Sequence, residues 1–141
     1  MTSPVNALQK AASATLIADE DASRLAATTP DGPAVFARGQ PFDDVYPRYT
    51  LEPPQRISAD NSCSIGADLI LTVHSWARGP DCTLVAGELA DAAVAALSTA
   101  LVLAGWRVTG WEFLSSRPVG DPDETVEHYV TSFRYTVRPG G

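Results

Sequence analysis

The chain has 141 residues, enough for one domain with its own apolar core. Apolar residues make up 45% of it and charged residues 19%, a composition typical of globular proteins and unlike that of disordered ones. The formal net charge of −7 disfavours tight nucleic-acid binding, because such binding neutralises phosphates with lysine and arginine. We therefore expect a single folded domain over residues 1–141.

Cysteine usage and the first residues bear on the compartment. Cys63 and Cys82 are too few for a disulfide scaffold and lie outside any metal-ligand spacing, so both are interpreted as reduced thiols used in packing. The opening MTSPVNALQK lacks the basic start and apolar run of a secretory signal, and no apolar run approaches the roughly 18 residues of a membrane span. These observations predict synthesis in the cytoplasm and no membrane partner.

The first predicted element is an amphipathic helix over residues 4–18, in which apolar side chains recur at intervals of three and four. Ser3 is its expected N-cap, and Pro4 occupies the first helical position. A short helical turn is expected through Leu25, and PDGP at residues 30–33 is a strong turn signal. The chain is therefore expected to change from helix to β structure near residue 30.

Two short strands are predicted next, at residues 34–39 and 48–53. The prolines around them are typical of strands at the edge of a sheet, because proline cannot donate a ladder hydrogen bond. Residues 58–66 are small and polar and indicate a loop, either a flap or a contact arm.

The longest strand of the first half is predicted from residue 66 to residue 78 and ends at Gly79-Pro80. Strand alternation places on one face Leu69, Leu71 and Val73. It places on the other face Ile70, Thr72, His74, Trp76 and Arg78. Asp81 is the expected cap of a helix that runs to about Ser98, whose alanine-rich apolar stripe must cover a sheet.

The last third of the sequence indicates a long hairpin, with strands at residues 106–117 and 125–138 and a tip at residues 118–124. Apolar residues alternate in the second strand, as expected when one face packs on a core. The predicted order is α-β-β-β-α-β-β. It describes an α+β domain without internal repeats or linkers.

Candidate chemistry is sparse. His74 and His128 lie on predicted strands, but nothing near them resembles a nucleophile elbow or a His-x-x-x-His ligand pair, so a hydrogen-bonded structural or surface histidine is favoured over a general base. The tip carboxylates lack the length and the glycine of an EF-hand loop and are expected to be solvated; they are Asp121, Asp123, Glu124 and Glu127. No catalytic residue, cofactor site or metal site is predicted.

The three tryptophans leave two interpretations open. Core packing explains Trp76, Trp106 and Trp111 more readily than a ligand site does. A tryptophan that proves exposed would instead indicate a protein interface.

The order of several segments identifies a family. These segments are YPRYTLEPP, then ADLILTVHSWARG followed by VAGELADAAVAAL, then RPVGDPDETVEHYVTSFRY. In this order the chain resembles the tail-completion, or tail-terminator, proteins of long-tailed phages and gene transfer agents over nearly its whole length. The resemblance implies a mixed, mostly antiparallel sheet with two main helices packed on one face. The segment TTPDGPAVFARGQPFDD departs from common members around the first strand.

The resemblance also implies a function without catalysis. Such proteins form a ring, usually of six copies, in the virion at the head-proximal end of the tail tube. The ring ends tube polymerisation and meets the head connector, and genomic DNA passes through its lumen without specific binding, which suits an acidic protein. Two alternatives remain: a stopper or adaptor ring at the same head-to-tail junction, and a small-molecule-binding or enzymatic domain using His74 or His128.

Contact positions follow from the predicted surface. We expect protein contacts at Trp76 and Arg78, in the loop around Asn61, and at the tip carboxylates Asp121 and Asp123. Neighbouring copies are expected to meet through sheet edges, where short strands limited by proline leave backbone groups unpaired. The tip is expected to point away from the core, because burial of its carboxylates without cationic partners would be costly.

Overall fold

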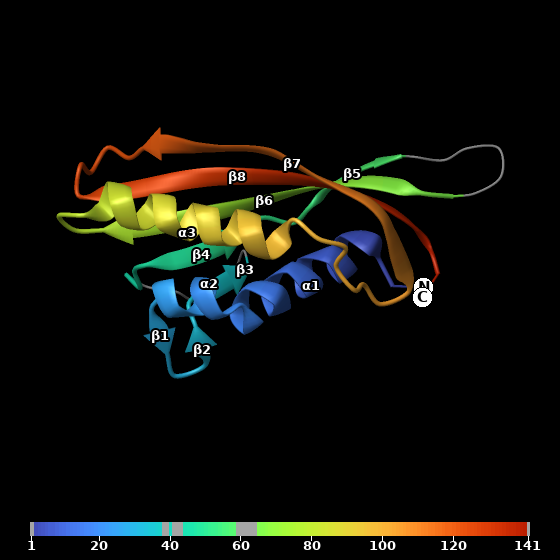
Figure 1. Ribbon diagram of the computed structural model, residues 1–141, viewed down its shortest axis with the longest axis horizontal. Coiled ribbons are helices and arrows are strands. Elements are labelled where there is room, and N and C mark those ends of the chain that lie inside the picture. Colours follow the sequence, from blue (N-terminus) through green and yellow to red (C-terminus); the bar gives the residue numbers. More distant parts are fainter. Residues whose placement is uncertain (1, 38–39, 41–43, 59–64, 141) are drawn as a thin grey trace.

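A mixed sheet with helices on one face forms the body of the protein (Figure 1). The computed structural model describes residues 2–37, 40, 44–58 and 65–140. The helices are α1 (Pro4–Ala18), α2 (Glu20–Leu25) and α3 (Cys82–Leu97). The strands of the main sheet are β3 (Val35–Ala37), β4 (Arg48–Leu51), β5 (Gln55–Ser58), β6 (Ala67–Arg78), β7 (Trp106–Gly120) and β8 (Val126–Pro139). This arrangement confirms the predicted α+β class.

The main sheet has the order β3-β4-β6-β8-β7, and β5 pairs with β6 beside β4. The β3–β4 pair is parallel and the other pairs are antiparallel. A small separate hairpin joins β1 (Thr28–Thr29) to β2 (Gly32–Pro33) around the predicted turn. The sequence did not predict β5, because its four residues are all exposed and carry no alternation of apolar side chains.

The helix termini follow local capping rules. The Ser3 hydroxyl accepts a hydrogen bond from the Asn6 amide at 3.4 Å, which confirms the predicted start of α1. Asp19 ends α1 and caps α2, where its carboxylate accepts from the Ala22 amide at 2.9 Å. Asp81 precedes α3 as predicted, but the expected side-chain cap is wrong, because its carboxylate accepts no helix amide.

The core lies between the helices and the covered face of the sheet. Leu69, Leu71 and Val73 of β6 are fully buried there, as the alternation predicted. Two buried tyrosines tie the sheet to α3: the Tyr49 hydroxyl donates to the Leu89 carbonyl, and the Tyr135 hydroxyl donates to the Leu97 carbonyl. Burial raises the pKa of both phenols, so they remain donors.

The hairpin of β7 and β8 is longer than predicted, because β7 continues through Pro118 to Gly120. The register of the pair shifts between Val108 and Gly110 and again between Phe113 and Ser115. These bulges bend the outer strand without ending it. Among the described residues, no helix is long and apolar enough to cross a membrane.

Candidate assembly surfaces

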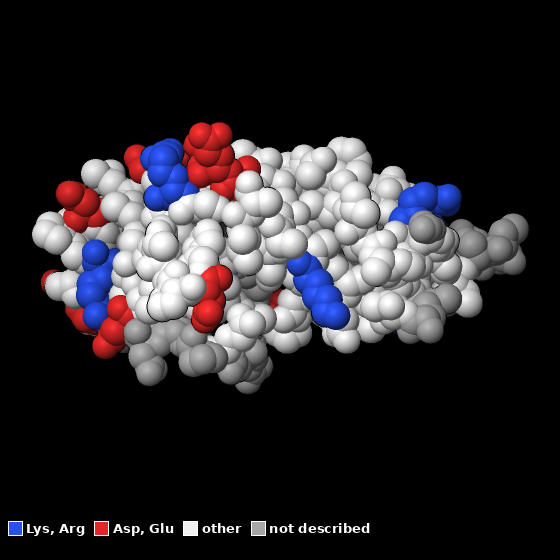
Figure 2. Space-filling view, turned by 90° about the horizontal axis from the view of Figure 1, so that it is seen from below, with Lys and Arg blue, Asp and Glu red and all other residues white. Residues whose placement is uncertain are grey.

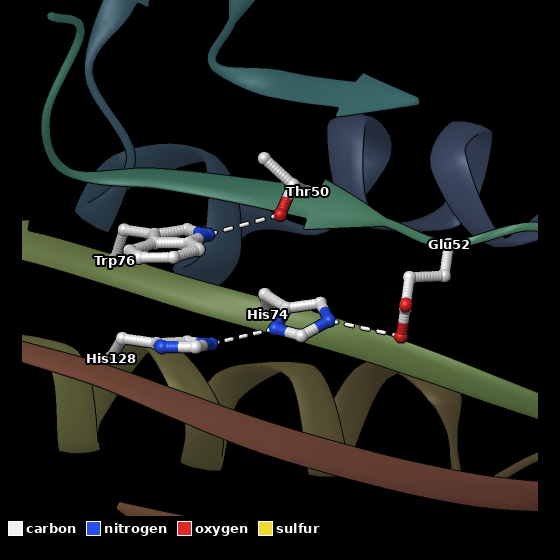
Figure 3. Close-up of polar contacts among 5 residues, drawn as sticks. All are labelled: Thr50, Glu52, His74, Trp76 and His128. Atoms are coloured by element: carbon white, nitrogen blue, oxygen red, sulfur yellow. Dashed lines mark hydrogen bonds and ion pairs between the residues drawn. The ribbon is translucent and has the colours of Figure 1, made fainter. Parts of the chain in front are cut away.

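The face of the sheet that the helices leave open carries a His–Trp cluster, formed by Thr50, Glu52, His74, Trp76 and His128 (Figure 3). His74 Nδ1 lies 2.6 Å from His128 Nε2, and His74 Nε2 lies 3.0 Å from a Glu52 carboxylate oxygen. The Trp76 indole stacks on the His128 ring with centroids 3.8 Å apart, and its N–H donates to the Thr50 hydroxyl. β4, β6 and β8 together position this cluster.

The bonding of the cluster limits its protonation. The close His74–His128 contact leaves room for one proton between the two nitrogens, so a second positive charge there would be repelled. Burial, and then the nearby His74, lower the pKa of His128. Each imidazole thus has a hydrogen-bonding or stacking partner within the sheet, as a hydrogen-bonded structural or surface histidine would.

A second group beside this cluster involves Tyr46, where two arginines approach one aromatic ring. The guanidinium carbon of Arg48 lies 4.3 Å from the ring centroid, and that of Arg78 lies 4.4 Å from it. Arg78 also forms an ion pair with Asp44 at 3.3 Å. The side chain of Arg78 is 43% exposed. The end of β6, where the sequence predicted protein contacts, is therefore a surface on which arginine side chains pack against an aromatic ring.

The hairpin tip is built by local hydrogen bonds. The Asp121 carboxylate accepts from the Asp123 amide at 2.9 Å, and the Asp123 carboxylate accepts from the backbone and hydroxyl of Thr125. The bond from the Thr125 hydroxyl is the main reason why the pKa of Asp123 lies below its ordinary value. Asp123 is exposed and Asp121 half-buried, as expected for a tip that points away from the core.

The outer strand β7 carries an exposed apolar strip on the helix side of the sheet. Trp111 is 49% exposed and Phe113 43%, and Leu114, which follows Phe113 within the second register shift, is 37% exposed. Trp111 and Phe113 lie opposite Tyr135 and Phe133, whose side chains are buried, but α3 packs mainly on β6 and β8 and leaves the strip open. No strand pairs with the outer side of β7 among the described residues.

The opposite edge of the sheet carries a groove between α1 and β3. Its volume is about 480 Å³, and among the described residues its lining includes Asn6, Gln9, Lys10, Ser13, Ala14, Ile17, Val35, Ala37 and Gln40. Figure 2 views the molecule from the side on which α1 lies in Figure 1. Acidic side chains gather there at one end, while the middle of the face is little charged.

The sequence of this chain matches the model of a known protein family. Residues 7–138 match the family described as "Tail completion protein gp17". The chain belongs to this family. The match includes α3, β6 and the hairpin and all but the last residue of the main sheet. It confirms the resemblance found in the sequence and identifies a structural protein of the tail.

A solved structure shares the fold. A chain of the structure titled "Virion of native gene transfer agent (GTA) particle" superposes with a TM-score of 0.83 at 23% sequence identity. The alignment covers 98% of this tail completion family chain and 99% of that one. At this identity the likeness establishes the fold. No curated protein matches the chain.

The structure brings four of the five predicted contact residues to one end of the sheet. Trp76 and Arg78 lie on the same face of β6. The hairpin tip with Asp121 and Asp123 lies beside them, because the Gly79 amide donates to the Thr125 carbonyl and Arg78 contributes to the lowered pKa of Asp123. Asn61 and Cys63 lie outside the described residues, and Cys82 is a buried free thiol at the start of α3. The sequence interpretation left Trp111 undecided, and Phe113 and the α1 groove were missed. Trp111 and Phe113 stand two residues apart in the sequence, as an aromatic pair on one face of a strand would. The sequence does not show that this strand lies at the edge of the sheet.

Proposed function

We propose that this protein forms a ring that caps the head-proximal end of the tail tube, ends tube polymerisation and joins the tail to the head connector. The observation that carries this proposal is the family match over residues 7–138. The ring would be a structural part of the virion at the head-tail junction, made in the cytoplasm of the bacterial host, with no enzymatic activity. Six copies are the number that the sequence resemblance implies.

The two edges of the sheet support a ring. A ring requires each copy to present two different surfaces, one for each neighbour. β7 forms one edge of the sheet, and β3 and β5 lie at the other side. The two edges therefore meet the requirement for head-to-tail contacts between copies.

The charge of the chain fits a lumen that DNA must traverse. The net charge of −7 would repel the phosphate backbone rather than hold it, so DNA would slide past without specific binding. The described acidic tip of the hairpin adds to this repulsion wherever it faces the lumen.

Two other functions have weaker support. A stopper or adaptor ring would share the same partners and differ in its position along the junction. A small-molecule or enzymatic role for His74 and His128 is disfavoured by their contacts, because each imidazole is engaged with the other and with Glu52 or Trp76.

Electron micrographs of a deletion strain test the proposal. A tube grows by a contact that does not close on itself, so growth continues until a different protein occupies its end. Loss of the cap should give filled heads together with tails that are abnormally long or unattached. Attached tails of normal length would overturn the proposal, and normal-length tails left unattached would favour the stopper or adaptor role.

A further inference from the structure

The two edges of the sheet carry features of opposite shape on the same side. The β7 edge presents projecting rings, Trp111 and Phe113, on the side of the sheet that holds the helices. The β3 edge presents the groove between α1 and β3 on that same side. Exposed rings next to an open strand edge are a common mark of a protein interface.

We propose that the rings of Trp111 and Phe113 of one copy insert into the α1–β3 groove of the next copy. This inference rests on the proposed ring and assigns its contact between neighbours. The contact is head-to-tail: the aromatic rings of one copy meet the groove of the next. The first copy keeps its groove free and the second keeps its rings free for a further neighbour. The sheets of successive copies would then share one helical side around the ring.

The lining of the groove suits aromatic occupants. Ala14, Ile17 and Val35 supply apolar surface for the rings. Lys10 places an ammonium group at the wall, where it can lie over an aromatic face. Asn6, Gln9 and Ser13 supply oxygen atoms that can accept the hydrogen bond of an indole N–H.

The β7 edge is better suited to contact a second copy through its side chains than to pair with an added strand of another protein. The two register shifts in β7, on either side of the Trp111–Phe113 stretch, interrupt the regular edge and limit backbone pairing with any long strand. The contact must therefore depend on side chains. Pairing of β7 with β7 of another copy would close a two-fold dimer and leave the groove empty, so it cannot build a ring.

Disulfide cross-linking tests the assignment. In a full chain with Cys63→Ser and Cys82→Ala, the pair Leu114→Cys and Ala14→Cys keeps both rings and places one thiol on each surface. Mild oxidation should give a ladder of cross-linked copies that ends at the closed ring. A matched control joins Val102→Cys, on a residue that is 94% exposed, to Ala14→Cys and should give no ladder.

The single-cysteine chain with Leu114→Cys separates the two edge arrangements. If it alone cross-links efficiently to a dimer, β7 meets β7 and the inference is overturned. The inference is also overturned if the double-cysteine chain gives no ladder. This includes the case in which the wild-type chain stays monomeric at the highest concentration. Neither result touches the proposed cap, which the tail lengths of the deletion strain decide.

Complementation provides an independent measurement. The variant with Trp111→Ser and Phe113→Ser keeps the groove, and the variant Ala14→Arg fills the groove but keeps the rings. Each alone should self-associate about tenfold or more weakly than the wild-type chain by analytical ultracentrifugation. Their mixture should form dimers but no larger rings, because it retains one intact contact. Unchanged association of either variant would overturn the inference. Leu84→Ser, on a residue 68% exposed on α3, is the control.

Discussion

The two strands of the long hairpin differ in what covers the same face. Phe133, Tyr135 and Val137 of β8 lie beneath α3 and are at most 1% exposed. Trp111 and Phe113 of β7 face the same side, directly opposite Tyr135 and Phe133, and remain about half exposed. The rings of Phe113 and Phe133 are only 6.0 Å apart. Phe133 therefore packs in the core, whereas Phe113, its neighbour on the adjacent strand, lies at the surface.

This difference shows what strand alternation can reveal. Alternation tells which residues share a face, because successive side chains point to opposite sides. It does not tell whether a helix covers that face. The long α3 lies over the middle strands and leaves open the stretch of β7 around Trp111 and Phe113, although Trp106 at the start of β7 is buried. The edge position, set by tertiary structure, therefore turns an apparent core strand into a candidate interface.

The largest expected effect concerns the two phenylalanines. Phe133→Ala should lower the free energy of unfolding by about 3–5 kcal/mol, because it leaves a cavity in the core. Phe113→Ala should lower it by less than about 1 kcal/mol, because the ring is already partly in water. Urea unfolding of both variants, at a concentration where the chain is monomeric, measures the difference. Equal losses would show that the β7 face is covered within one copy.

The sequence predicted the fold well where its signals were local. The cap at Ser3, the alternation of β6 and the apolar face of β8 each depend on residues close in the chain, and all three agree with the structure. The sequence did not predict that strand β5 follows β4 after Pro53-Pro54. The backbone of β5 pairs with β6, but its four exposed residues show no alternation of apolar and polar side chains.

The candidate sites depended on contacts that the sequence does not contain. His74 and His128 are 54 residues apart, and only the β6–β8 register brings their rings together. Lys10 and Val35 likewise meet at one groove because α1 packs beside β3. The sequence supplied the residue types at these sites, but strand order and helix placement supplied their partners.

An intermediate effect is expected for the buried hydroxyl of β8. Tyr135→Phe removes the donor to the Leu97 carbonyl and leaves that carbonyl unpaired in the core, so the free energy of unfolding should fall by about 1–2 kcal/mol. Tyr129→Phe on the same strand is the control, because its half-buried ring is closer to water and the loss should be smaller. Thermal unfolding of both variants measures the difference. Equal or reversed losses would show that the Tyr135 bond contributes little to the hold of α3 on β8.

The smallest expected effect concerns His128 on the open face of β8. It is a change in the free energy of unfolding with pH. Burial and then His74 hold the pKa of His128 below its ordinary value of 6.5, against the opposing influence of Asp121 and Glu127. Arg117 lowers it further. Below pH 6.5 the unfolded chain therefore binds a proton at this position that the folded chain resists, and the free energy of unfolding should fall as the pH falls towards the folded pKa.

The variant His128→Gln isolates this contribution, because glutamine does not titrate while the surrounding carboxylates stay the same. Urea unfolding of both chains from pH 7.5 to pH 5 should show a steeper loss of stability in the wild-type chain, and a difference smaller than that expected for Tyr135→Phe, since solvent near this open face screens the charge. Above pH 7 the two pH profiles should run parallel, because His128 is neutral in both the folded and the unfolded chain. A wild-type chain that gained stability on acidification relative to the variant would show that the folded state takes up the proton more readily, and that the cluster holds a charged His128 against the opposing effect of His74.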